Sequence, residues 1–290
     1  MKPIKKIYCR IFQNVFKFAL PFLPYRNPEI IGSLKAVPDV LKKKKCENVL
    51  IITDPGIYKL GLTQRLERAL TGSGISYILY NKTVANPTTE NVAEALELYH
   101  QNNCNAIIGF GGGSSMDCAK AVGARVAKPH QSLAKMKGIL KVHKRLPLLI
   151  AVPTTAGTGS ETTLAAVIVD SETRYKYAIN DFPLIPRYAV LDPKVTLSLP
   201  PFITATTGMD ALTHAVEAYI GNSTTPGTRK NALDAVQLIF NNLDTAYTDG
   251  SNKEARRNML RASYFAGCAF TKSYVGYVHA IAHSLGGQYN

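Results

Sequence analysis

Two pairs of side chains that commonly bind metals lie in the last third of the sequence. Asp210 and His214 are four residues apart, and His279 and His283 repeat that spacing. On a helix this spacing puts both side chains on one face, one turn apart. A single pair is more often a solvated face or a pair of hydrogen-bonded core histidines, but two pairs on helices that can face each other favour a metal site. A carboxylate with imidazoles and no thiolate nearby suits Fe²⁺ or Zn²⁺ better than Mg²⁺ or Ca²⁺, and it leaves iron and zinc both open.

A glycine-rich turn follows the apolar run at residues 106–108. Gly109 is followed by three glycines at 111–113 and by two serines, and a helix is predicted at 116–122. Glycine lets a ligand approach the backbone closely, and the free N–H groups at a helix start bind phosphate oxygens. The third glycine of the dinucleotide fingerprint and the lysine position of the phosphate loop are both missing, so an ordinary strand-to-helix turn is the alternative. Three consecutive glycines followed by two serines favour phosphate binding.

A second ligand-binding loop is predicted after the strand at residues 148–152. Residues 153–161 read PTTAGTGSE, so hydroxyls and glycines are concentrated where that strand ends. Ligands of open α/β sheets bind at the carboxyl ends of the strands. A hydroxyl-rich turn is the plain alternative, but two such loops on separate parallel strands favour a ligand site.

The elements that must position these residues follow an alternating strand and helix pattern. Strands are predicted at 48–53, 74–80 and 106–108, with helices at 62–70, 90–102 and 116–122, followed by an antiparallel excursion at 167–170 and 177–179 and a last strand at 189–191. Continuous apolar runs are typical of parallel strands buried on both faces. Long helical patterns take over after 199–201. The fold class is therefore an α/β nucleotide-binding unit with a parallel sheet, followed by an all-α unit.

Three segments follow from this pattern. Residues 1–45 are predicted to form a basic, partly helical leader, 46–198 the α/β domain and 199–290 the helical, metal-binding domain. The leader contains four consecutive lysines at 42–45 and several prolines. Its role is not predicted.

Composition is that of a soluble globular protein. The 290 residues are 46% hydrophobic and 19% charged, with a net charge of +14. No apolar run approaches the roughly 18 residues of a membrane span, so no membrane partner is expected.

Five scattered cysteines without C-x-x-C spacing favour reduced thiols, and the protein is expected in the cytoplasm. The basic runs lack interleaved aromatic residues, so no nucleic-acid partner is expected, and steering of an anionic cofactor ranks behind a solvated surface.

Four motifs together resemble the iron-containing (group III) alcohol dehydrogenase family. They read GFGGGSSMDCAK, PTTAGTGSETT, GMDALTHAVEAY and GYVHAIAHSLGGQYN, and the resemblance runs from about residue 48 to residue 290. It implies an N-terminal NAD-binding α/β domain and a C-terminal helical domain, in the fold shared with dehydroquinate synthase. It also implies reversible oxidation of an alcohol to an aldehyde or ketone by hydride transfer, with a metal lowering the pKa of the alcohol.

The same resemblance assigns roles to individual residues. Metal ligands are Asp210, His214 and His279, and His283 is a candidate proton relay near the nicotinamide. The positions that match NAD-binding residues are Asp54, Asn86, Gly111, Gly112, Gly113, Ser114, Thr154, Thr155, Thr158 and Lys176. Asp54 favours NAD, because a carboxylate accepts hydrogen bonds from ribose hydroxyls and repels a 2′-phosphate.

One departure from the family pattern concerns the metal site. The family places its fourth metal ligand shortly after the position of Asn290, and the helical domain is shorter than the resemblance implies, so the chain is expected to be a fragment. The alternatives are a glycerol dehydrogenase or a dehydroquinate-synthase-like enzyme on the same fold, or a catalytically inactive NAD-binding fragment. A small alcohol or aldehyde is the expected substrate, and the family suggests a homodimer.

Overall fold

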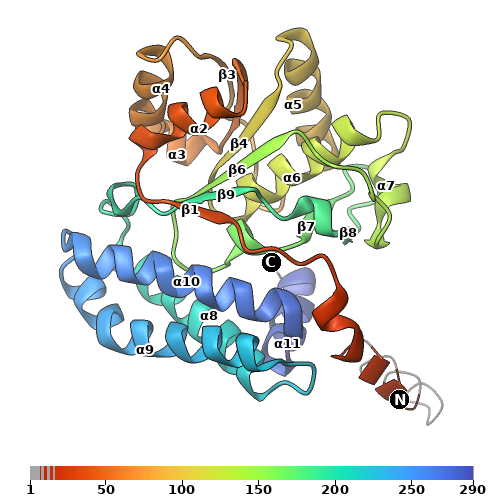
Figure 1. The fold of residues 1–290 in the computed structure, drawn as a ribbon, viewed down its shortest axis with the longest axis vertical. Helices are drawn as coiled ribbons and strands as arrows, with labels where there is room; N and C mark the ends of the chain where they lie inside the picture. Colours follow the sequence, from red (N-terminus) through yellow and green to blue (C-terminus); the bar gives the residue numbers. More distant parts are fainter. Residues whose placement is uncertain (1–6, 8–9, 12–13, 16, 290) are drawn as a thin grey trace.

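The structure, a computed structural model, consists of an α/β part stacked on a bundle of long helices (Figure 1). It describes residues 7, 10–11, 14–15 and 17–289, and for 21, 283–284 and 286–289 it describes the backbone alone. The predicted fold class, a parallel sheet followed by helices, is confirmed. Within the described residues, no helix is both long enough and apolar enough to cross a bilayer.

Six strands form the main sheet, in the order β1-β9-β6-β4-β2-β3, and every neighbouring pair is parallel. The strands are β1 (Glu29–Ile31), β2 (Asn48–Ile52), β3 (Ser76–Tyr80), β4 (Ala106–Gly111), β6 (Leu148–Pro153) and β9 (Tyr188–Val190). The central strands β2, β4 and β6 are apolar along most of their length because helices cover both faces of the sheet.

Helices divide between the two faces of this sheet. On one face α5 (Thr89–Gln101) and α6 (Gly113–Ala127) pack against side chains such as Leu50 and Ile107. On the other face α2 (Val37–Lys43) and α4 (Gln64–Thr71) pack against Val49 and Ile108. The shorter helices are α3 (Pro55–Lys59), α7 (Leu133–Met136), η1 (Leu20–Phe22), η2 (Leu34–Ala36), η3 (Ser160–Thr162), η4 (Phe182–Leu184) and η5 (Pro193–Val195). Alternation of side chains along each strand thus supplies two hydrophobic cores.

A second sheet of three strands lies beside the first. Its strands β7 (Ala165–Val169) and β8 (Lys176–Asn180) are antiparallel, which confirms the predicted excursion. The third strand, β5 (Gly138–Ile139), pairs in parallel with β8. Two residues are too short a run to give a sequence signal, so β5 was not predicted.

Part of the predicted basic leader belongs to the α/β core. The sequence predicts a leader up to residue 45, whereas β1 pairs with β9 at the edge of the main sheet and the side chains of Leu34, Val37 and Leu41 are buried. These three apolar residues are spaced for one face of a helix, but the prolines and lysines around them made the stretch resemble an exposed leader in the sequence. The first described residues project away from the body of the molecule, whereas the stretch just before β1 lies against it, with the Pro28 carbonyl accepting a hydrogen bond from Tyr264 Oη at 2.6 Å (Figure 1).

The helical part contains α8 (Pro201–Ile220), α9 (Pro226–Thr248), α10 (Lys253–Ser273) and α11 (Tyr277–Tyr289). Alanines from α8, α9 and α10 meet in two layers, formed by Ala215, Ala235 and Ala266 and by Ala218, Ala232 and Ala269. Small side chains bring the three helix axes close together and so fix the position of α8, which carries Asp210 and His214.

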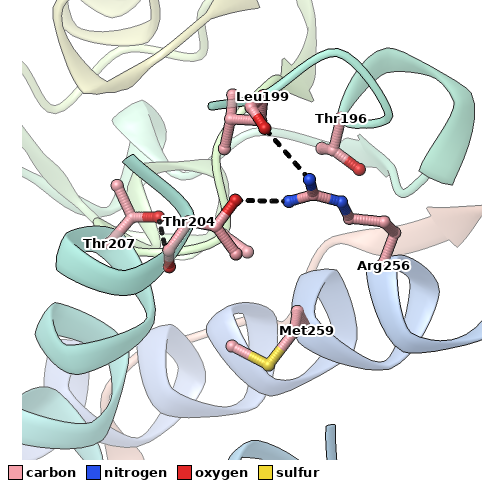
Figure 2. A pocket seen from close by; sticks show the side chains of 7 residues that line it. Thr196, Leu199, Thr204, Thr207, Arg256 and Met259 are labelled. Atoms are coloured by element: carbon pink, nitrogen blue, oxygen red, sulfur yellow. Dashed lines mark hydrogen bonds between the residues drawn. The ribbon is translucent and has the colours of Figure 1, made fainter. Parts of the chain in front are cut away.

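A buried arginine holds the start of α8 against α10. Arg256 donates hydrogen bonds to Thr204 Oγ1 at 2.6 Å and to the Leu199 carbonyl at 3.1 Å (Figure 2). Its Nε also donates to the Gly250 carbonyl at 3.0 Å. The cavity beside it measures about 10 Å³, which is room for one water molecule and too little for a ligand. Arg256 therefore has a structural role at the junction of the two parts.

Candidate active site

Three loops that were predicted to bind NAD meet at the carboxyl edge of the main sheet. Asp54 follows β2, Gly111 ends β4 and Thr154 follows β6. The Thr154 N–H donates to the Gly111 carbonyl at 3.0 Å, and the Ser115 hydroxyl donates to Asp54 Oδ2 at 3.5 Å. The strands are parallel, so their carboxyl ends lie at one edge and bring the three loops together.

Glycine is required where the second of these loops turns into α6. Gly111 has φ +148°, and a Cβ there would lie 2.5 Å from Ser115 Oγ and 2.9 Å from Ser115 Cβ. Gly112 is the N-cap of α6 and Gly113 its first residue. Since Gly112 has no side chain to cap the helix, the first N–H groups of α6 are open to a bound anion.

Asn86 and Lys176 extend this edge from two further elements. Asn86 lies in the loop after β3 with φ 57°, and its N–H donates to Ser114 Oγ at 3.2 Å. Lys176, the first residue of β8, donates from Nζ to Asn86 Oδ1 at 2.7 Å. A cation thus stands beside the glycine-rich turn, where an anionic cofactor is predicted.

The hydroxyl-rich loop after β6 joins this edge to the helical part. Thr154 Oγ1 is buried and has no hydrogen-bond partner among the described residues. The side chain of Thr158 lies 3.4 Å from where a Cβ on Gly113 would stand, and a Cβ on Gly157 would lie 2.7 Å from Thr207 on α8. Gly157 therefore allows the loop to pack directly against the helix that carries the predicted metal ligands.

The predicted metal ligands come together from α8 and α11. One ligand atom from each of Asp210, His214 and His279 can be chosen so that all three atoms lie within 4.8 Å of one another. Asp210 Oδ1 is 3.9 Å from His214 Nδ1 and 3.5 Å from His279 Nε2. The two imidazole rings are stacked, with centroids 4.2 Å apart. These spacings fit a divalent transition metal held by one oxygen and two nitrogens.

The environment of His214 matches that of a neutral metal ligand. Burial lowers its pKa to about 4, although Asp210 opposes the shift. Its Nδ1 is buried without a hydrogen-bond partner among the described residues, and its ring stacks on Phe270 at 4.0 Å. A buried nitrogen that carries a lone pair and faces a carboxylate is otherwise costly, which is evidence that the site accommodates a cation.

Glu217 is a functional candidate that was not predicted from the sequence. Its Oε2 accepts hydrogen bonds from His279 Nδ1 at 2.6 Å and from the Gly276 N–H at 2.8 Å, and its Oε1 accepts from the Val278 N–H at 2.7 Å. Burial raises the pKa of Glu217, but these bonds outweigh it and lower the pKa overall. A hydrogen bond with Asp210 raises the pKa of His279, and the bond with Glu217 acts in the same direction. Glu217 thus orients His279 so that Nε2 faces Asp210.

A signal for Glu217 does exist in the sequence. Asp210, His214 and Glu217 are spaced i, i+4 and i+7, which is one face of a helix. Glu217 forms its hydrogen bonds with His279 and the backbone beside it, more than sixty residues later in the chain. This contact becomes visible only in the folded structure.

A buried lysine network was also missed. Lys120 Nζ donates to Thr163 Oγ1 and to the Ala165 carbonyl, each at 2.8 Å, and to Ser160 Oγ at 3.1 Å. Ser160 in turn donates to Asp117 Oδ1 at 2.9 Å. Burial lowers the pKa of Lys120 to about 8. The network ties α6 to the end of the hydroxyl-rich loop and so holds two of the three cofactor-side loops in place.

The structure places all but one of the predicted site residues in two groups, the cofactor-side residues at the carboxyl edge of the main sheet and the metal ligands on α8 and α11. The exception is His283, which is on α11, four residues after His279, and whose side chain lies outside the described residues. Its predicted role as a proton relay stays a prediction.

Comparison with known protein families matches most of the chain to the family that the four sequence motifs resemble. Residues 30–193 match the family described as "Iron-containing alcohol dehydrogenase", and residues 204–290 match "Fe-containing alcohol dehydrogenase family, C-terminal".

Individual relatives agree with this match. Alcohol dehydrogenase 4 of Saccharomyces cerevisiae (strain YJM789) is 41% identical over 259 residues, which cover 89% of this chain and 68% of the yeast protein. An NAD-dependent methanol dehydrogenase of Bacillus methanolicus is 38% identical over 268 residues, which cover 92% of this chain and 70% of that protein. The crystal structure of a 1,3-propanediol oxidoreductase matches with a TM-score of 0.87 and 36% identity, over 91% of this chain and 69% of the other.

Replacing Glu217 by glutamine should weaken metal binding. The amide keeps the size of the side chain but offers one acceptor oxygen where the carboxylate offers two, so His279 and the first turn of α11 lose a partner. We expect affinity for Zn²⁺ or Fe²⁺, measured by calorimetric titration, to fall by about 10–100-fold. Glu254→Gln, on the exposed start of α10, is the matched control and should bind metal like the unaltered chain. Equal affinities for the two variants would contradict the orienting role.

Proposed function

This chain belongs to the iron-containing alcohol dehydrogenase family, and from that premise we propose that it interconverts an alcohol and its aldehyde or ketone, using NAD and a divalent metal. The observation that carries the proposal is the hydroxyl-rich loop, which is bonded to the glycine-rich turn through the Thr154 N–H and packs against α8 at Gly157. Through this loop the cofactor-side residues are joined to the helix that carries Asp210 and His214, which supports binding of NAD and the alcohol as neighbours, as hydride transfer requires.

NAD is the cofactor that we propose for the sheet edge. The first N–H groups of α6 would bind the pyrophosphate of NAD, and Lys176 would add a positive charge beside them. Asp54 accepts hydrogen bonds from ribose hydroxyls. Its Oδ1 already accepts from the Ile57 N–H at 2.9 Å, which fixes the side chain as the N-cap of α3. We propose the same cofactor-side role for Asn86, Ser114, Thr154, Thr155 and Thr158.

Asp210, His214 and His279 are the residues that we propose to hold the metal, with Fe²⁺ preferred and Zn²⁺ as the alternative. When bound, the metal supplies Lewis acidity that favours the deprotonated alcohol and polarises the carbonyl of the product, while NAD accepts and returns the hydride. Glu217 accepts the hydrogen bond of His279 Nδ1, so Nε2 is the ring nitrogen that is directed at the metal site. His283 is proposed to accept the proton that the alcohol loses.

Several further properties belong to the same proposal. The substrate is a small primary or secondary alcohol, as the names of the relatives suggest. We propose a cytoplasmic location, which agrees with the free thiols of the four described cysteines, and a homodimer as the assembly.

Replacing Asp54 by asparagine should relax the preference for NAD over NADP. Asparagine keeps the oxygen that caps α3 and removes the charge that repels a 2′-phosphate. We expect the ratio of the Kd for NADP to the Kd for NAD, measured by titration of protein fluorescence, to fall about tenfold, a change of about 1.4 kcal/mol. Asp39→Asn, an exposed carboxylate on α2, should leave the ratio unchanged. An unaltered ratio in the Asp54 variant would remove the ribose assignment.

Alcohol oxidation itself is tested with the metal-free protein. After chelation, the protein is supplied with Fe²⁺ under anaerobic conditions or with Zn²⁺, together with NAD and a panel of alcohols, and NADH absorbance is followed. We expect turnover only with metal, and none after His279→Ala, because the variant lacks one of the clustered ligands. His100→Ala, an exposed histidine on α5, should behave like the unaltered protein. A His279 variant that oxidises alcohols without metal would overturn the proposal.

A further inference from the structure

The described residues between positions 7 and 22 are helical, and most of them are exposed. Apolar side chains recur along this segment at spacings of four, four, three and four, namely Ile7, Ile11, Val15, Phe18 and Phe22. That spacing places them on one face of a helix. Phe18 and Phe22 are 84% and 83% exposed and the other three are 58–63% exposed, so the described chain leaves most of this apolar stripe uncovered.

The charge of this segment has one sign. Residues 1–28 contain no aspartate or glutamate. Their cations are Lys2, Lys5, Lys6, Arg10, Lys17 and Arg26. Arg10 and Lys17 are exposed, like the apolar stripe. A basic helix with one strongly apolar face is typical of segments that lie in the interface of an anionic bilayer.

A basic cleft lies next to the end of the segment. Its volume is about 910 Å³, and Pro24 and Arg26, just after Phe22, form part of its wall. The cations that line it are Arg26, Lys44, Arg145 and Arg187. The lining carboxylate, Asp181, already accepts hydrogen bonds from the backbone N–H groups of Val142, His143 and Phe182. Arg187 pairs with Glu29 at 3.0 Å, and Arg26, Lys44 and Arg145 outnumber Asp181, so the cleft carries a net positive charge.

Arg26 links the segment to the cleft. Its guanidinium donates to the Ile185 carbonyl, while its Nε is buried without a hydrogen-bond partner among the described residues. Burial lowers the pKa of Arg26, and the nearby Arg187 and Arg145 lower it further. Clustered guanidinium groups repel one another and are relieved by an anion between them.

We propose that the segment before β1 and the adjacent basic cleft form a docking surface for an anionic phospholipid bilayer. The apolar stripe enters the interface between headgroups and acyl chains, and the cations of the segment and the cleft contact lipid phosphates. This binding is peripheral and agrees with the lack of a membrane-crossing helix among the described residues. It replaces the expectation from composition that the chain has no membrane partner.

Charge distinguishes this partner from a second copy of the chain. A two-fold interface through the stripe places the same surface of each copy against the other. Arg10 and Lys17 of one copy would then approach the equivalent cations of its partner, and the segment offers no acidic side chain to offset the repulsion. An anionic bilayer offers both an apolar interior for the stripe and negative phosphates for the cations.

The test is co-sedimentation of the full chain with vesicles of phosphatidylcholine, with and without phosphatidylglycerol. We expect binding to the anionic vesicles only. Phe18→Ser with Phe22→Ser should weaken it at least about tenfold, because two large apolar side chains no longer insert. The matched control is Phe202→Ser with Phe240→Ser, two residues that are each 72% exposed on α8 and α9. It should bind like the unaltered chain.

A second variant tests the charge. Arg10→Gln with Lys17→Gln alters exposed side chains only, and we expect about fivefold weaker binding for each cation removed. Circular dichroism and thermal unfolding check that both variants fold like the unaltered chain.

Three results would overturn the proposal. The first is equal binding to both kinds of vesicle, or to neither. The second is binding to anionic vesicles that is insensitive to loss of Phe18 and Phe22, which would show charge attraction alone. The third is a lipid-free dimer, seen by light scattering, that becomes monomeric in the Phe18 and Phe22 variant while vesicle binding is missing.

Discussion

The carboxylate of Glu217 is the interaction on which the metal-ligand cluster depends. It accepts hydrogen bonds from two backbone N–H groups at the start of α11 and from the ring of His279. One side chain of α8 therefore fixes the position of α11 and the orientation of the histidine that α11 carries. Without it, Nδ1 of His279 loses its hydrogen-bond partner, and only the contact of Nε2 with Asp210 at 3.5 Å and the stacking on His214 still orient the ring.

The same principle of a single group joining two elements recurs on the cofactor side. Lys120 ties α6 to the end of the hydroxyl-rich loop, and Gly157 lets that loop pack against Thr207 on α8. Arg256 then holds the start of α8 against α10. These contacts fix the position of the metal-binding helices relative to the rigid parallel sheet. The two halves of the site therefore keep a constant position relative to each other.

Much of this arrangement could be predicted from the sequence, because it depends on patterns among residues that are close together in the chain. The apolar runs of β2, β4 and β6 mark strands buried on both faces, and the spacing of Asp210 and His214 marks one helix face. β1 escaped because it has three residues, of which two are exposed, so it carries neither an apolar run nor an alternation. Glu217 and Lys120 escaped because their partners are far away in the chain, and only the packed fold shows that these charged side chains are buried.

The central claim is that a metal and NAD bind side by side on the residues described above. It is tested most directly by a crystal structure of the protein loaded with Fe²⁺ and NAD, with anomalous diffraction collected at the iron edge. The account predicts an anomalous peak at about 2.0–2.2 Å from Asp210, His214 and His279. It also predicts the pyrophosphate of NAD against the N–H groups at the start of α6. An iron peak bound elsewhere, or NAD density away from the glycine-rich turn, would contradict the account.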